Sequence, residues 1–153
     1  MFDINAQLPQ LFSESTGNST RYLNGLDVVA QQRNNEGWSY FGQDGLGSVR
    51  QMIDPAQNVT MNAEYDPYGV PIAPPTTTLG YTGAPTDANG LVYLNARYLD
   101  PATGTFLTRD PFEGVADSAM SRNPYSYTGG NPVNRTDRSG KFAPVHFAWH
   151  LLN

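Results

Sequence analysis

Short alternations of apolar and polar residues, separated by turns, run along the first half of this chain. Residues 20–32 (TRYLNGLDVVAQQ) hold two β-prone runs around an Asn-Gly pair, a combination typical of a two-residue hairpin. Further β-prone runs follow at residues 38–43 (WSYFGQ), 48–53 (SVRQMI) and 58–65 (NVTMNAEY). Alternation with a period of two predicts half-buried strands. We therefore expect a series of antiparallel hairpins.

The second half of the chain has shorter segments of more mixed character. Residues 71–78 (PIAPPTTT) are expected to form a surface loop, because proline donates no ladder hydrogen bond. Residues 79–83 and 123–128 are predicted to be short strands. Helical character is weak and confined to residues 113–121, with a further short helix expected at residues 144–152.

One stretch, residues 90–110 (GLVYLNARYLDPATGTFLTRD), organises the chemistry of the chain. Two apolar, β-rich runs flank an Asp-Pro-Ala-Thr-Gly turn, so we expect a hairpin here. The hairpin would bring Arg97, Asp100 and Asp110 close together, and the later chain adds a third acidic residue, Asp137. A fixed cluster of charged groups is the expected result.

Composition supports a mostly-β, turn-dense fold. The chain has 15 Gly, 12 Pro and 9 Tyr, and only 15% of its residues are charged, against roughly 25% in an average soluble domain. Turn signals recur at intervals of about ten residues, as expected for repeated strand-turn units. They favour stacked antiparallel hairpins that form a winding sheet within one domain.

Charge and residue usage exclude several classes of function. The net charge is −5, with 9 Lys+Arg against 14 Asp+Glu, so no basic surface for nucleic acid is expected. The absence of cysteine excludes disulfides, thiolate metal sites and a cysteine nucleophile. Of the two histidines, His146 and His150, neither has a third ligand nearby, so we expect no metal and no cofactor. The apolar stretch at 142–152 is too short to span a membrane, and residues 1–10 lack a signal-peptide pattern.

A specific family resemblance rests on ordered motifs between residues 38 and 140. The motifs are DGLGSVR at 44–50, YDPYG at 65–69, YTG at 81–83, the stretch 90–111 and YSYTGGNPVN at 125–134. In this order they resemble the Rhs repeat-associated core domain of the YD-repeat family of bacterial toxin-shell proteins. The resemblance implies a core domain over residues 1–140, followed by an apolar tail at 141–153.

What the resemblance implies is a structural role combined with self-cleavage. In this family, tyrosine-aspartate repeats wind into a hollow shell around a toxin polypeptide, and the core domain closes one end. In secreted toxins of the class the core domain also acts as an intramolecular aspartic protease that frees the C-terminal cargo. The residues for that activity map onto Arg97, Asp110 and Asp137, with the cut near Phe142. Expected partners are other Rhs/YD-repeat segments, copies of the chain itself and a C-terminal cargo, and the expected location is secreted or cell-surface.

The carboxylate pair has a plausible chemistry and a simpler alternative. Two adjacent carboxylates do not both ionise readily, so one keeps a proton and serves as an acid while the other serves as a base. Arg97 would position a carboxylate or stabilise developing negative charge. Alternatively, Asp110 and Asp137 cap turns by accepting backbone N–H bonds, and Arg97 forms a salt bridge with Asp100 or Asp110.

Departures from the family pattern leave a second function open. Arg138 stands where proline is usual and is expected to keep Asp137 ionised, and Thr105 stands where arginine is usual. We expect the stretch 141–153 to be too short to serve as an encapsulated toxin. The alternative is a self-assembling subunit of an extracellular tube or filament without enzymatic activity, built by pairing of open sheet edges.

Overall fold

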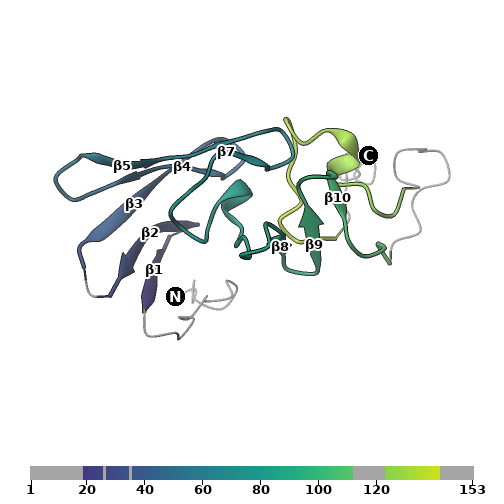
Figure 1. The fold of residues 1–153 in the computed structure, drawn as a ribbon. Helices are drawn as coiled ribbons and strands as arrows, with labels where there is room; N and C mark the ends of the chain where they lie inside the picture. Colours follow the sequence, from purple (N-terminus) through teal and green to yellow (C-terminus); the bar gives the residue numbers. More distant parts are fainter. Residues whose placement is uncertain (1–18, 26, 35, 112–122, 142–153) are drawn as a thin grey trace, which may run out of the picture. The chain divides into compact units, whose positions relative to one another are not determined.

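The structure, a computed structural model, is mostly β in its described part, which confirms the fold class expected from the sequence (Figure 1). Strands are connected by turns and by short 3₁₀ segments. Within this part no helix is long and apolar enough to cross a membrane. The helices predicted at 113–121 and 144–152 lie outside the described residues. The described residues are 19–25, 27–34, 36–111 and 123–141.

The chain divides into two compact units. The first comprises residues 1–42 and 51–60, and the second comprises residues 43–50 and 61–153. All the residues of the predicted charged cluster belong to the second unit.

A five-stranded sheet with the order β1-β2-β3-β4-β5 carries the alternating runs of the first half of the chain. The Asn-Gly pair ends β1, and the register pairs Leu23 with Ala30 and Ala30 with Tyr40. Ala30 is fully buried, whereas Leu23 and Tyr40 are exposed. The strands are β1 (Thr20–Asn24), β2 (Val28–Arg33), β3 (Trp38–Gln43), β4 (Val49–Ile53) and β5 (Val59–Asn62).

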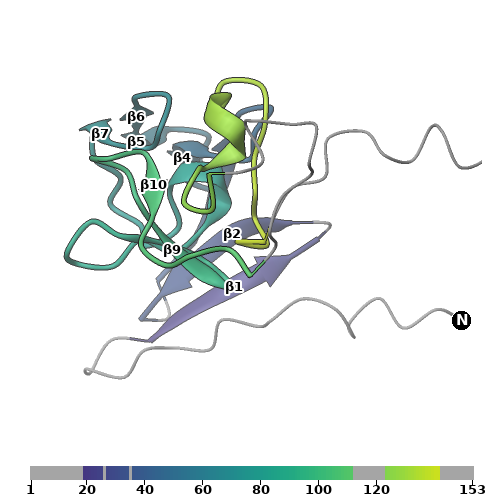
Figure 2. The same ribbon diagram turned by 90° about the vertical axis from the view of Figure 1, so that its right-hand side faces the viewer.

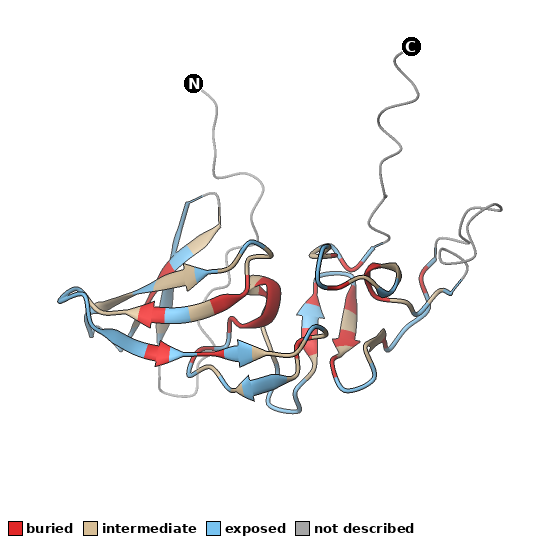
Figure 3. Ribbon diagram, turned by 90° about the horizontal axis from the view of Figure 1, so that it is seen from above, coloured by how far each residue is buried: buried red, intermediate tan, exposed pale blue. Residues whose placement is uncertain are grey.

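The core of the second unit lies on one face of a three-stranded sheet with the order β10-β9-β8. Val92, Leu99 and Phe106 are paired across it and all three are buried, whereas Tyr93 is exposed. Figure 3 shows buried and exposed stretches of the ribbon in red and pale blue. The core cluster consists of Tyr81, Ala84, Val92, Leu94, Leu99, Phe106 and Tyr127. The strands are β8 (Val92–Leu94), β9 (Arg97–Asp100) and β10 (Thr105–Phe106).

The predicted single strand at 58–65 is wrong in its extent. The chain leaves β5 after Asn62 and starts a separate strand, β6 (Glu64–Tyr65), which pairs with β7 (Pro71–Ala73). The expectation that residues 71–78 form only a loop is therefore also incorrect. Proline is tolerated at the start of β7 because the β6–β7 pairing is irregular there and the sheet has only two strands.

Two further predicted strands do not form. In the 79–83 segment, η1 (Tyr81–Gly83) places Thr82 and Gly83 at φ values of 53° and 71°, which a strand does not allow. In the 123–128 segment only Ser126 forms an isolated bridge, and η3 (Thr128–Gly130) begins at Thr128. Both segments instead curl the chain around the core.

Candidate functional site

A tight turn between β8 and β9 places Arg97 in the core. Asn95 has a φ of 56°, and the N–H of Ala96 donates to the carbonyl oxygen of Leu94. The predicted hairpin over residues 90–110 is therefore a three-stranded meander with an additional turn. Because side chains alternate along a strand, Arg97 lies on the same face as buried Leu99, and its side chain is only 5% exposed.

The two acidic residues reach Arg97 from different parts of the chain. Asp110 follows β10, and its N–H donates to the carbonyl oxygen of Pro124 over 2.9 Å. Asp137 lies beyond η3, in the segment that returns alongside β8 and β9 (Figures 1 and 2). The structure thus brings together all three predicted site residues.

Arg97 is the centre of a buried charge cluster. Its Nη2 lies 2.7 Å from Oδ2 of Asp110 and 3.6 Å from Oδ2 of Asp137. The side chains of the two acids are only 10% and 4% exposed. The guanidinium carbon also lies 3.6 Å from the centre of the Phe106 ring, a cation–π arrangement that is stronger when desolvated. One buried cation therefore faces two buried carboxyl groups.

The remaining donors of Arg97 bind backbone carbonyls. Nη1 donates to the carbonyl oxygen of Pro124 over 3.1 Å, and Nε donates to that of Gly140 over 2.5 Å. The fork geometry of arginine suits such multiple contacts. Arg97 consequently orients the polypeptide just after Asp137 as well as the two acids.

The carboxyl group of Asp137 retains its proton to a higher pH than an ordinary aspartate. Burial raises its pKa from the ordinary value of 3.8, and nearby Asp110 raises it further. Hydrogen bonds from Ser139 and from the Lys141 backbone, together with the Arg97 cation, oppose this shift without cancelling it. Asp137 is therefore suited to act as an acid.

Burial raises the pKa of Asp137, and the groups that oppose this shift are Ser139, Arg97 and the Lys141 backbone rather than Arg138. The Nε of Arg138 donates to the carbonyl oxygen of Thr82 over 3.0 Å. Its guanidinium also fills the space beside Gly47 and Gly83, where a Cβ atom would clash with it. Arg138 thus anchors the segment that carries Asp137.

Residues 138–140, which we call the strap, lie across the β8–β9 turn. The Nδ2 of Asn95 donates to the carbonyl oxygen of Arg138 over 2.7 Å, and the N–H of Ala96 donates to that of Ser139 over 3.1 Å. Gly140 has a φ of 62°, and a Cβ atom there would collide with the carbonyl oxygen of Leu94. Only glycine permits this close approach.

The alternative salt bridge to Asp100 does not form. One oxygen of Asp100 accepts the N–H of Ala102 over 3.0 Å, and the other accepts the hydroxyl of Thr103 over 3.0 Å. Asp100 therefore caps its own turn, as an aspartate before proline commonly does. The hydroxyl of Thr105 lies 2.9 Å from that of Thr103 and extends this turn network.

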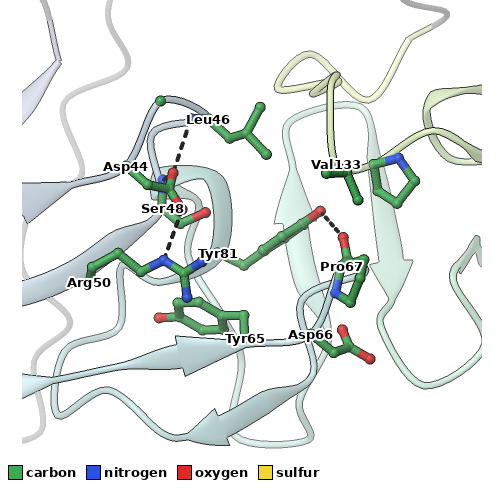
Figure 4. A pocket seen from close by; sticks show the side chains of 11 residues that line it. Asp44, Leu46, Ser48, Arg50, Tyr65, Asp66, Pro67, Tyr81 and Val133 are labelled. Carbon is green, nitrogen blue, oxygen red and sulfur yellow. Dashed lines mark hydrogen bonds and ion pairs between the residues drawn. The ribbon is translucent and has the colours of Figure 1, made fainter.

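A pocket of about 540 Å³ forms a separate feature of the second unit (Figure 4). Asp44 accepts hydrogen bonds from the N–H groups of Leu46 and Ser48 in its own turn. It also forms an ion pair with Arg50 at 2.9 Å. Tyr81 donates to the carbonyl oxygen of Pro67. These bonds give the pocket wall a structural role. The lining residues are Asp44, Gly45, Leu46, Ser48, Arg50, Tyr65, Asp66, Pro67, Tyr81, Pro132 and Val133.

The sequence did not indicate three of the groups that complete the charge cluster. The backbone carbonyls of Pro124 and Gly140 leave no side-chain signal, and no motif marks Ser139 between Arg138 and Gly140. A small polar residue two positions after Asp137 was the only signal available. In the described part of the chain, no group of three or more potential metal ligands occurs.

The fold and site define a mostly-β protein with a buried arginine–carboxylate cluster. The chain matches no protein-family profile. It is 29% identical to the tRNA(Glu)-specific nuclease WapA of Bacillus subtilis subsp. natto over 74% of this chain and 5% of that protein. It is 33% identical to salivary gland surface protein 1 of Aedes aegypti over 81% of this chain and 4% of that protein.

Among solved structures, the chain is similar to the TcdB2-TccC3-Cdc42 crystal structure. The TM-score is 0.66 with 26% identity, over 81% of this chain and 6% of that one. The chain thus spans only about a twentieth of the relatives that it matches. These similarities support a loose relation to Rhs-type toxin proteins.

Proposed function

We propose that this chain is an Rhs core domain: a β-scaffold that helps to close a shell around a C-terminal polypeptide and cuts itself near Phe142. The burial of Asp110 and Asp137 on one Arg97 side chain carries the proposal. A scaffold alone has no need for two carboxyl groups in its core, because buried charges rarely stabilise a fold more than apolar residues of similar volume. Secretion or display at the cell surface belongs to the same proposal.

The two acids have distinct roles in the proposed reaction. Asp110, at 2.7 Å from the cation, acts as the base that takes a proton from water. Asp137, whose pKa is raised by burial, supplies a proton to the peptide carbonyl under attack. This division of labour matches the general rule for paired carboxyl groups in different environments.

The position of the polypeptide after Asp137 supports an intramolecular reaction. Arg97 holds the carbonyl oxygen of Gly140, so the following peptide units begin beside the acids. A tethered substrate avoids the entropic penalty of encounter, which amounts to roughly 7–11 kcal/mol of a barrier. The experiment that follows tests whether this proximity is productive.

Self-cleavage is measurable as a loss of mass from the C-terminal end. We expect a time course of in vitro translation, followed by intact-mass spectrometry, to show a cut near Phe142 in the parent chain. The variants Asp110→Asn and Asp137→Asn should stay intact because each removes one carboxyl function. Asp100→Asn is the matched control, since Asp100 only caps a turn, and should be cut like the parent. An intact parent chain would refute the protease.

A second candidate function is self-assembly through sheet edges. In the described part of the chain, β1 and β5 are the outer strands of the five-stranded sheet. Leu23, Tyr40 and Val59 of that sheet are exposed apolar side chains. Open edges of this kind favour pairing between copies. Light scattering should then show large species that Leu23→Lys, on β1, reduces; a strictly monomeric parent would count against assembly.

A further inference from the structure

The hydroxyl group of Ser139 lies between Asp137 and the carbonyl group of Lys141. Its Oγ is 2.7 Å from Oδ1 of Asp137 and 3.3 Å from the carbonyl oxygen of Lys141. It also accepts the N–H of Lys141 over 3.1 Å. A single side chain therefore connects a buried acid to the peptide group that begins the tail.

This hydroxyl has one hydrogen and two acceptors within reach. When Asp137 is ionised, the hydrogen belongs on the shorter contact to its carboxylate, because a charged acceptor binds more strongly. When Asp137 is protonated, the carboxyl group can donate to Oγ, which frees the hydroxyl hydrogen for the Lys141 carbonyl. A hydroxyl can both donate and accept, so this reversal needs no movement of heavy atoms.

We propose that Ser139 relays a proton from Asp137 to the carbonyl oxygen of Lys141, and so directs cleavage to the Lys141–Phe142 bond. The proposal rests on the self-cleavage proposed above and names a further residue in it. Ser139 is a catalytic residue in this proposal because it contacts the reacting carbonyl, whereas Asp137 reaches that carbonyl through Ser139.

The relay gives a balanced hydrolysis. As the water oxygen bonds to the Lys141 carbonyl carbon, Asp110 takes one water proton. Asp137 passes its proton to Oγ of Ser139, and Oγ passes its own hydrogen to the carbonyl oxygen, giving a neutral gem-diol. On collapse the carbon–nitrogen bond breaks, Asp110 protonates the departing amine, and a gem-diol hydrogen returns through Ser139 to Asp137. The products are a Lys141 carboxyl group and a Phe142 amine.

Two features of the site favour the relay. Burial raises the pKa of Asp137, which favours the protonated state that the relay needs. The backbone of Ser139 is fixed by the bond from the N–H of Ala96, and the Gly140 carbonyl is fixed by Arg97. The hydroxyl group is consequently held in place from both sides. The other charged or titratable groups facing Asp137 are Arg97, Asp110 and Tyr127.

The first test compares cleavage rates of Ser139 variants in the full chain. Ser139→Ala should slow cleavage by about 100-fold, the lower end of what general acid catalysis contributes. Ser139→Thr keeps a hydroxyl group and should recover most of the rate. If Ser139→Ala is cut at the parental rate while Asp137→Asn is not cut, the protease stands and the relay is overturned.

The second test detects the coupling between Asp137 and the Lys141 carbonyl without requiring cleavage. In Asp110→Asn, which should stay intact and lacks the second carboxyl group of the cluster, the ¹³C shift of the Lys141 carbonyl is followed against pH by NMR. We expect it to titrate together with the Asp137 carboxyl shift, and the coupling should vanish when Ser139→Ala is added. If the parent chain is never cut, the same NMR titration of the parent tests the relay. A Lys141 carbonyl shift that does not change as Asp137 titrates would overturn it.

Discussion

At the scale of single residues, Arg97 holds the site together. It binds two acids and two backbone carbonyls from a buried position, and it stacks on Phe106. Removing one partner from a buried charge cluster leaves the others without compensation. The fold and the proposed chemistry therefore depend on the same side chain.

Arg97→Met should destabilise the chain by about 3–5 kcal/mol at neutral pH, because two buried carboxylates lose their cation. The matched control is Arg50→Met, which breaks the more exposed pair with Asp44 and should lose at most about 1 kcal/mol. Urea unfolding measures both. An equal loss in the two variants would contradict a central role for Arg97.

The loss in Arg97→Met should also depend on pH. The folded parent already binds the Asp137 proton more tightly than the unfolded chain, since the folded pKa is raised above 3.8. The free energy of unfolding therefore falls as pH rises from that ordinary value through the raised one. Without the cation this pKa rises further, so acid should narrow the gap between variant and parent. A gap that widens in acid would contradict this sign.

At the scale of elements, the strap and the β8–β9 turn form one interlocking unit. Backbone and side-chain donors of the turn bind the strap carbonyls, and Gly140 makes the approach possible. The segment carrying Asp137 is thereby fixed against the strand that carries Arg97.

Gly140→Ala should lower stability by about 1–3 kcal/mol beyond a matched glycine substitution, because its Cβ would meet backbone atoms of the turn. Gly129→Ala is the control: Gly129 has a φ of 63°, close to the 62° of Gly140, but open space around its Cβ position. Both variants place alanine in the left-handed region, so the difference between their melting temperatures reports the collision of the Cβ atom at position 140. Equal melting temperatures would show that the strap yields easily.

At the scale of the whole molecule, the sequence predicted strands best where alternation was regular. The strands of residues 20–53 were expected almost as they occur, because Asn-Gly and similar turns mark their ends. The prediction failed at 79–83 and 123–128, where Thr82 and Thr128 adopt positive φ values, which threonine rarely does.

The members of the charge cluster were predictable from the sequence, but the contacts around them were not. Arg97, Asp110 and Asp137 were identified through family resemblance, and their convergence agrees with the structure. Burial, the contact with Phe106 and the anchoring of Arg138 on Thr82 depend on long-range packing. Local sequence does not encode such contacts.

The strap has a consequence for turnover. If the bond after Lys141 is cut, the new chain end remains attached to residues 138–140, which the β8–β9 turn and Arg97 still hold. The product thus occupies the site in which it was made and keeps any second polypeptide from entering. Each molecule of such a protein would therefore complete a single turnover.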